Sequence, residues 1–357
     1  MKLKPTIISH KPAKHGGIYS IPNPRSEILD FSSNINPLGP HPNVLKTINK
    51  NLNSLSIYPD PESKNLKKAI QKYTKIPYSR IVVGNGATEI IYNFCNSFLS
   101  KTTPVLIPIP TFSEYESASK LASAKVRVFK TMDLNNNLKE FRVQIPRNGC
   151  IFVCNPNNPT GKLLNKNKMK NIVESSKKKN TLVFVDECFI ELVPGHNESI
   201  ISLVKKYDNL FVLRSFTKSF GLAGIRIGYG IGSEKLISIL NKIKIPWNVS
   251  GLAQYAATTS ISNSQHLIKS KKLIQKELNY LKSQISRLPN FECEDSTTNF
   301  ILIKSKIKSP TIQKQLLKKK ILIRDCSSFH GLNKNFIRIA IKTRKENQKL
   351  VKALEEL

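Results

Sequence analysis

The chain has 357 residues and a mass of 40.3 kDa, which exceeds one ordinary domain and is enough to bury a substantial core, so we expect two domains. Its 57 Lys and Arg residues outnumber 24 Asp and Glu residues and give a formal net charge of +33. A basic chain can bind nucleic acid through counterion release. These lysines, however, are spread along the whole sequence, and the short runs at 177–180 and 317–320 contain no aromatic residue. We therefore expect a solvated basic surface that attracts anionic substrates, and no specific nucleic-acid site.

The cysteines and the apolar runs indicate the compartment. No C-x-x-C pair occurs and most cysteines fall within apolar stretches, which is typical of buried thiols in a reducing compartment and predicts no metal site. No apolar run has the length of a signal peptide or of a membrane span. We therefore expect a cytoplasmic protein that does not contact membranes. The six cysteines are Cys95, Cys150, Cys154, Cys188, Cys293 and Cys326.

The first 45 residues predict an irregular arm with one strand at 28–31, because they are rich in Pro, Gly, Asn and Ser. The arm contains two unusual segments, H-G-G at 15–17 and D-F-S-S-N-I-N-P-L-G-P at 30–40. In these segments His15 offers an imidazole and Asn34 an amide to a ligand. For His15 a structural role fits the sequence equally well.

From residue 42 to about 246, short apolar runs alternate with helical segments. This alternation predicts an α/β domain in which a largely parallel sheet is covered by helices on both faces. In such a sheet, ligands bind outside the carboxyl ends of the strands. The strands are expected at residues 81–83, 104–108, 125–129, 151–153, 181–185, 210–213 and 225–229.

One of these strands ends in Asp186. A carboxylate at the end of an apolar strand costs free energy unless a cation pairs with it. A protonated pyridine nitrogen is one such cation.

The strand at 210–213 leads into the segment S-F-T-K-S-F-G, which contains Ser215 and Lys218, and Arg226 follows. Partial desolvation and the neighbouring arginine lower the pKa of Lys218 toward that of a nucleophilic amine, which suits a Schiff base. Ser215 and Arg226 offer a hydroxyl and a guanidinium to a phosphate ester. Taken alone, this stretch is better explained by a solvated surface lysine, since lysine is abundant throughout the chain.

Two further segments follow strands in the same way. G-N-G-A-T-E at 84–89 opens a helix expected to run to about Leu99, and its backbone amides at Gly86 and Ala87 can approach a phosphate. C-N-P-N-N-P-T-G at 154–161 presents the amide of Asn158 on a proline-fixed turn. Each segment alone could be an ordinary turn or a helix start. Together, four strand ends point at one ligand.

After Trp247 a long helical stretch to about residue 288 leads into an α+β part, with strands expected at 300–303, 321–324 and 336–340. Arg324 ends the second of these strands and Arg338 lies within the third. An arginine in an apolar strand is costly to bury and usually has an anionic partner. A structural salt bridge is the alternative, and it is a serious one for Arg324.

The order and spacing of the four segments resemble the fold-type I pyridoxal-phosphate enzymes of the aspartate aminotransferase superfamily. The resemblance implies a large domain with a mostly parallel sheet covered by helices and a smaller α+β domain. Residues 1–45 would form an arm over the active-site mouth, residues 46–247 the large cofactor-binding domain, and residues 248–357 the small domain.

The resemblance also implies roles for individual residues. Lys218 would carry pyridoxal 5'-phosphate covalently, and Asp186 would hold the pyridine nitrogen. Asn158 would bind the ring hydroxyl oxygen, and Phe112 of P-T-F-S-E-Y would stack on the ring. The cofactor phosphate would be held by Ser215, Arg226 and the amides of Gly86 and Ala87. The superfamily further implies a homodimer in which Tyr58 reaches the neighbouring subunit's cofactor phosphate, although Tyr58 could also be a simple turn residue.

Within the superfamily the likeness is nearest to the threonine-phosphate decarboxylases, which make aminopropanol phosphate for cobalamin, and it includes H-G-G, D-F-S-S-N-I-N-P-L-G and I-L-I-R-D-C. It implies a small phosphorylated amino acid as substrate, with Arg338 on its carboxylate, Arg324 on its phosphate, and His15 and Asn34 nearby. Histidinol-phosphate aminotransferase is the alternative. Aminotransferases of this group usually place a tyrosine hydroxyl on the cofactor's ring oxygen, where this chain has Phe189.

Overall fold

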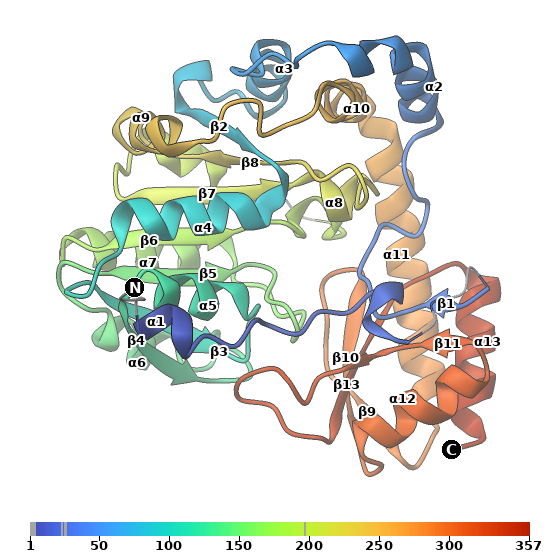
Figure 1. The fold of residues 1–357 in the computed structure, drawn as a ribbon. Helices are drawn as coiled ribbons and strands as arrows, with labels where there is room; N and C mark the ends of the chain where they lie inside the picture. The colour runs from blue at the N-terminus through green and yellow to red at the C-terminus, as the bar shows by residue number, and fades with distance from the viewer. Residues whose placement is uncertain (1–4, 23, 25–26, 196–197) are drawn as a thin grey trace.

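The computed structural model describes residues 5–22, 24, 27–195 and 198–357, which form a large and a smaller domain (Figure 1). The large domain contains a seven-stranded sheet in the order β2-β8-β7-β6-β5-β3-β4. Only β8 is antiparallel to its neighbours, so the predicted, largely parallel sheet is confirmed. The strands are β2 Ile81–Gly84, β3 Pro104–Ile109, β4 Lys125–Lys130, β5 Cys150–Cys154, β6 Leu182–Asp186, β7 Leu210–Ser215 and β8 Gly228–Ile231.

Helices cover both faces of this sheet because side chains alternate along each strand. In β5, Ile151 and Val153 face one apolar core, whereas Phe152 and Cys154 face the other. The first core is closed by α2 Pro42–Lys50, α3 Lys64–Thr74, α6 Leu138–Gln144, α7 Lys166–Lys177, α8 Phe216–Ser219 and α10 Gly251–Ile261. The second core is closed by α4 Gly86–Phe98, α5 Glu114–Leu121 and α9 Glu234–Ile243.

The small domain is built on an antiparallel sheet in the order β12-β13-β10-β9, which confirms the expected α+β part. The arm joins this domain, because β1 pairs in parallel with β11 and Phe31 enters the small-domain core. Its elements are β1 Leu29–Asp30, β9 Phe291–Cys293, β10 Phe300–Ser305, β11 Ile321–Leu322, β12 Arg324–Asp325, β13 Phe336–Ala340, α12 Ser309–Lys318 and α13 Arg344–Glu355.

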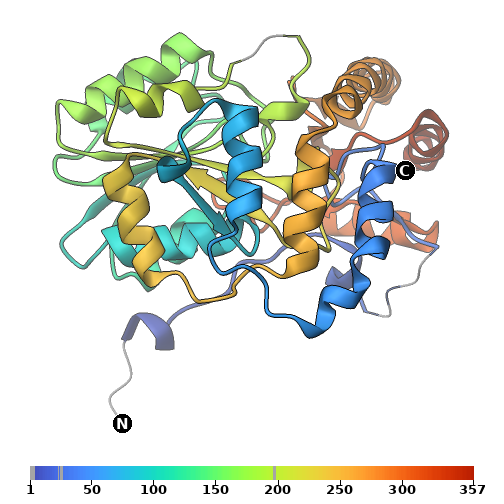
Figure 2. The same cartoon turned by 90° about the horizontal axis from the view of Figure 1, so that it is seen from above.

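The two domains are joined by α11 Ser264–Ile285, which runs from one to the other (Figure 1). Leu267 near its start packs into the large-domain core, and Leu281 near its end packs into the small-domain core. Helix α10, which precedes it, packs on α2 and α3, and Figure 2 shows α3 and α10 side by side. The chain therefore passes from the large domain to the small domain within α11.

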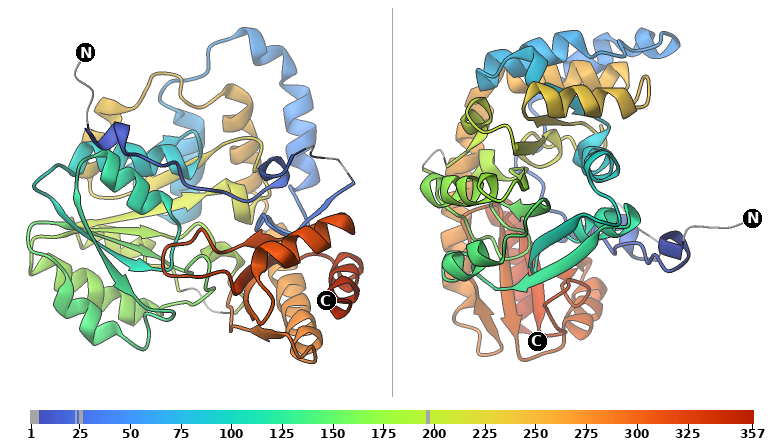
Figure 3. Two further views of the ribbon diagram at one scale, coloured as in Figure 1. Left: turned by 60° about the horizontal axis from the view of Figure 1, so that its bottom comes forward. Right: turned by 90° about the vertical axis from the view of Figure 1, so that its left-hand side faces the viewer.

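The arm begins with α1 Pro5–Ile8, which packs on α5, and then crosses to the small domain (Figure 3, left). Short 3-10 helices complete the secondary structure: η1 Ile18–Ser20, η2 Leu52–Ser56, η3 Tyr78–Arg80, η4 Ile190–Leu192 and η5 Ile201–Lys205.

Four elements differ from the sequence-based expectation. The strand expected at 225–229 begins only at Gly228, because Arg226 adopts the left-handed conformation with φ 57°. The strand expected at 321–324 is divided at Ile323, so that its halves join different sheets. The long helical stretch after Trp247 is two helices, α10 and α11, and β9 was not predicted.

All six cysteines are free thiols, and all except the half-buried Cys293 are buried, as expected. Within the described ranges, no helix is both long and apolar enough to cross a membrane.

Candidate active site

A cavity of about 450 Å³ lies at the carboxyl ends of the large-domain strands, where the arm and the small domain meet the large domain. Most of the predicted site residues line it, although they come from segments up to about 300 positions apart. Gly86 and Tyr58 are the predicted residues that do not. The lining includes His15, Asn34, Ala87, Phe112, Asn158, Asp186, Ser215, Lys218, Arg226, Arg324 and Arg338.

Asp186 ends β6 and is buried, with protein donors on both carboxylate oxygens. The backbone amide of Cys188 donates to Oδ1 at 2.8 Å, and the hydroxyl of Tyr115 donates to Oδ2 at 2.6 Å. Burial raises the pKa of Asp186, and these hydrogen bonds and the charge of Lys218 oppose that shift. Tyr115 stands in the P-T-F-S-E-Y segment, but the sequence indicated no role for it.

Lys218 lies in the single turn α8 that follows β7, and its side chain is half-buried in the cavity. Burial lowers the pKa of Lys218 to about 8, and the positive charges of Arg338 and Arg226 contribute to the shift. The sequence predicted a depressed lysine pKa with Arg226 as the neighbouring cation. The structure shows that Arg338 contributes more, which could not be foreseen because Arg338 is distant in sequence.

The residues predicted to hold a phosphate lie together at the amino end of α4. Gly86 has φ 81°, and a Cβ atom built there would lie 2.5 Å from Arg226 Nη2, so only glycine fits against this guanidinium. Ser215 caps α8 through its Oγ, which accepts from the amide of Thr217 at 3.0 Å. The first amides of a helix have no partner within the helix and attract anions. Ala87, Ser215 and Arg226 thus face the cavity as a set of donors.

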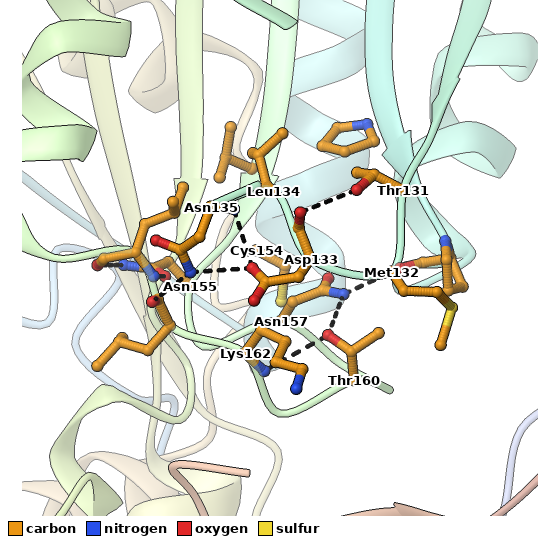
Figure 4. Close-up of a pocket in the computed structure, with 15 residues that line it drawn as sticks. Thr131, Met132, Asp133, Leu134, Asn135, Cys154, Asn155, Asn157, Thr160 and Lys162 are labelled. Carbon is orange, nitrogen blue, oxygen red and sulfur yellow. Dashed lines mark hydrogen bonds between the residues drawn. The ribbon is translucent and has the colours of Figure 1, made fainter. Parts of the chain in front are cut away.

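The N-N-P-T-G turn holds Asn158 through its neighbour Asn157. Asn157 Nδ2 donates to the Pro110 carbonyl at 2.9 Å and to Thr160 Oγ1 at 3.0 Å, beside a small cavity of about 30 Å³ (Figure 4). Asn158 Oδ1 accepts from Arg338 Nη1. This contact orients the amide so that its Nδ2 is the atom left to donate to a ligand.

Arg324 and Arg338 are direct cross-strand partners in β12 and β13, and both side chains are buried. Like charges placed opposite each other destabilise a sheet. Across the described residues, neither arginine forms an ion pair with a carboxylate; Arg324 contacts the Lys14 carbonyl and Ser328 Oγ, and Arg338 contacts the Ser32 carbonyl at 2.7 Å. Burial lowers the pKa of both, that of Arg338 to about 10. The structural salt bridge considered from the sequence is therefore absent from the described chain, and the pair has unmatched charge for an anionic ligand.

A buried donor of Arg338 supports this conclusion, and a buried acceptor of Asn34 in the same cavity would suit a donor group of the ligand. Arg338 Nε and Asn34 Oδ1 have no hydrogen-bond partner among the described residues. An unsatisfied buried polar atom costs about 1 to 3 kcal/mol of stability. A ligand that forms hydrogen bonds to both atoms would recover this cost as binding free energy.

His15 lies at the rim of the cavity, with its ring centroid 5.9 Å from that of Phe112. Its Nε2 is 2.6 Å from Oε1 of the buried Glu114, and Tyr92 donates to Oε2 at 2.7 Å. Burial raises the pKa of Glu114, but the hydrogen bonds from His15 and Tyr92 outweigh it and hold the pKa below its usual range. His15 thus has a clear structural partner as well as a position beside the cavity.

A buried ionic cluster lies under the site and was not predicted. Arg214 pairs with Glu187 at 2.8 Å and with Glu191 at 2.5 Å, and Ser219 Oγ donates to Glu191 Oε2 at 2.9 Å. Glu187, Arg214 and Ser219 each neighbour a predicted cofactor residue in sequence. Because side chains alternate between the two faces of a strand, Glu187 and Arg214 point away from the cavity, and Ser219, in the turn α8, does not line it either. The sequence signal that could have revealed the cluster is the pair of adjacent polar residues at the ends of β6 and β7, one facing the cavity and the next facing away.

Tyr58 lies outside the cavity and is 78% exposed, with its ring 4.9 Å from that of Trp247. Its predicted role across a dimer interface stays a prediction.

The donors and charges of the cavity fit pyridoxal 5'-phosphate. A buried carboxylate, Asp186, suits a protonated ring nitrogen, and Lys218 provides an amine with a low pKa. The donors of Ala87, Ser215 and Arg226, with Gly86 packed against the guanidinium, suit the phosphate. The half-buried ring of Phe112 faces the same cavity.

The comparisons with known proteins agree with this site. The chain is 36% identical over 332 residues to the histidinol-phosphate aminotransferase of Methanosarcina mazei, covering 92% of this chain and 88% of that protein. It is 37% identical over 352 residues to a protein of Caldanaerobacter subterraneus subsp. tengcongensis proposed to be a threonine-phosphate decarboxylase, covering 97% and 94%. Further relatives at 30% to 35% identity are named histidinol-phosphate aminotransferase.

Among solved structures, the L-threonine-O-3-phosphate decarboxylase from Porphyromonas gingivalis superposes with a TM-score of 0.85 at 27% identity, over 92% of this chain and 99% of that one. The family described as aminotransferase class I and II matches residues 26–354. The chain therefore belongs to the class I and II aminotransferase family, whose members bind pyridoxal 5'-phosphate.

Proposed function

We propose that this protein is a pyridoxal-phosphate-dependent decarboxylase that converts L-threonine O-3-phosphate into CO₂ and (R)-1-aminopropan-2-yl phosphate, a step in cobalamin biosynthesis. One observation carries the proposal: Arg324 and Arg338 are buried side by side with no carboxylate partner among the described residues, and they line the same cavity as Lys218. A phosphorylated amino acid presents two anionic groups to such a pair.

The residues have separate tasks in this reaction. Bound pyridoxal phosphate supplies a protonated ring that accepts the electron pair of a bond broken at the substrate's α-carbon. Arg338 binds the α-carboxylate and Arg324 the phosphate, so that the substrate is oriented at both ends. The bond from the α-carbon to the carboxylate breaks, CO₂ leaves, and a proton replaces it. No keto acid is needed for this reaction.

Lys218 Nζ would hold the cofactor covalently until the substrate amine takes its place. With a pKa of about 8, this amine exchanges a proton readily near neutral pH, so Lys218 can hold or deliver a proton at the α-carbon.

Phe189 supports decarboxylation over transamination, because it provides no hydroxyl where related aminotransferases have one. The Phe189 ring packs against Phe300 with centroids 5.1 Å apart, and the Arg338 guanidinium lies 5.5 Å from the Phe300 ring centroid. The aromatic pair thus supports the arginine that binds the carboxylate.

Histidinol-phosphate aminotransferase is the second candidate, since the similar proteins carry that name more often. Histidinol phosphate has no carboxylate for Arg338, but the glutamate of a transamination does.

The test offers the enzyme phosphothreonine alone, then histidinol phosphate with 2-oxoglutarate, and measures CO₂ and glutamate. CO₂ release without a keto acid supports the decarboxylase, and the Lys218→Ala variant controls for uncatalysed release. Glutamate formation without CO₂ would overturn the proposal but leave the cofactor residues as assigned.

A further inference from the structure

The hydroxyl of Tyr115, the last residue of the P-T-F-S-E-Y segment, is hydrogen-bonded to Asp186, and the resemblance implied no role for it. It donates to Asp186 Oδ2 at 2.6 Å, from α5 on one side of the sheet to the end of β6. Tyr115 is 1% exposed, so water does not compete for this hydrogen bond. The other carboxylate oxygen is held by the amide of Cys188.

Neighbouring aromatic rings fix the position of this hydroxyl. The Tyr115 ring stacks on Phe152 with centroids 5.4 Å apart and an angle of 17° between the planes. Phe112 meets its edge at 5.6 Å and 78°. A ring held on two sides cannot swing away, so the phenol presents its proton to Asp186 in one geometry.

We propose that Tyr115 is a positioning residue that holds Asp186 in a single orientation and in its ionised form for the ring nitrogen of pyridoxal phosphate. The proposal rests on cofactor binding at this site and holds whether the enzyme decarboxylates or transaminates its substrate.

The charge balance at Asp186 explains why such a donor is needed. Tyr115, Cys154, Cys188 and Lys218 are the titratable groups that influence Asp186 or face it from the surrounding elements. Burial favours the protonated carboxyl group and raises the pKa of Asp186, whereas the hydrogen bonds from Cys188 and Tyr115 and the charge of Lys218 favour the anion. If Asp186 were protonated, it could not stabilise a proton on the ring nitrogen, and the ring would accept electrons less well.

The variant Tyr115→Phe tests this, because it removes one oxygen and keeps the buried ring. The wild-type and variant apoenzymes are reconstituted with cofactor labelled with ¹⁵N in the ring, and the ¹⁵N chemical shift is followed against pH. We expect the ring nitrogen of the variant to lose its proton at a pH about one unit lower, and the cofactor dissociation constant to rise about tenfold.

Tyr207→Phe is the matched control, because Tyr207 also donates to a carboxylate, Glu174 Oε1, at 2.6 Å but does not line the cavity. It should leave both readouts unchanged. A purely structural role for Tyr115 would lower thermal stability without moving the ¹⁵N shift, and that result would overturn the proposal.

A double variant shows whether Tyr115 acts through Asp186. In an Asp186→Asn background, Tyr115→Phe should change the ¹⁵N shift no further; additive effects would contradict the proposal. None of these readouts uses substrate, so they stand or fall independently of the proposed decarboxylation.

Discussion

The imidazole Nε2 of His15 lies 2.6 Å from Oε1 of the buried Glu114, so the arm is hydrogen-bonded to the first turn of α5. The preceding residue, Lys14, accepts through its carbonyl from Arg324 Nη2. Adjacent arm residues thus bind opposite sides of the cavity, one to the large domain and one to the small domain.

Replacement of Glu114 by Gln should loosen the arm. A glutamine has a single acceptor oxygen, so it cannot serve both His15 and Tyr92. We expect KM for phosphothreonine to rise roughly tenfold with kcat little changed, since a hydrogen bond to a charged group is worth about 1.5 to 3 kcal/mol. Steady-state kinetics measure this. Glu116→Gln is the control, because Glu116 pairs with His330 and Lys120 outside the cavity; equal effects of the two changes would contradict the prediction.

The low pKa of Lys218 predicts the pH dependence of cofactor capture. With a pKa of about 8 in place of the ordinary 10.5, the nucleophilic neutral amine increases as pH rises through 8. The rate at which the apoenzyme captures pyridoxal phosphate, followed by stopped-flow absorbance, should rise with pH with a midpoint near pH 8 and level off about one unit higher. Arg338→Met should move the midpoint to higher pH, because it removes the positive charge that lowers the pKa of Lys218 most. A wild-type midpoint near pH 10 would contradict the predicted desolvation.

The two arginines should be separable with substrate analogues. Arg324→Gln should abolish the preference for phosphothreonine over threonine and weaken inhibition by the product, 1-aminopropan-2-yl phosphate, about 100-fold. Arg338→Gln should leave inhibition by that product nearly intact, because the product has no carboxylate, while KM for phosphothreonine rises. Inhibition constants measure both effects. The reverse pattern would show that the two arginines exchange roles.

An exposed apolar surface around Tyr58 predicts the dimer interface. Leu55, Ile57 and Trp247 are also strongly exposed there. Leu55→Asp should shift the protein toward a monomer in light scattering, and Tyr58→Phe should keep the dimer but release cofactor faster. Val143 on α6 is as exposed as Tyr58, so Val143→Asp is the control that should change neither. A wild-type monomer with full activity would contradict the predicted interface.

The sequence was sufficient to predict the sheet and the gathering of its strand-end motifs, because periodicity and turn residues are local signals. Lys218, Asp186 and Asn158 come together as a direct result of the parallel order of β5, β6 and β7. The predicted strand boundaries were wrong where one residue changes the backbone conformation. Arg226, for example, has a positive φ, and β8 begins only after it.

Relations across long sequence separations could not be predicted in this way. The register that places Arg324 opposite Arg338 depends on how β12 and β13 pair, and the contact of Tyr115 with Asp186 depends on how α5 packs on the sheet. Neither leaves a periodic pattern in the sequence, although both decide the electrostatics of the cavity.

The buried cluster of Glu187, Glu191, Arg214 and Ser219 limits how this enzyme can be re-engineered by exchanging segments with relatives. A loop taken from another family member brings its own residue beside Asp186 or Lys218, and a mismatch would leave a charge buried without its partner, at a cost of about 3 to 5 kcal/mol. Chimaeras that transfer residues 186–191 together with 214–219 should therefore fold, whereas those that transfer either segment alone should accumulate as insoluble protein.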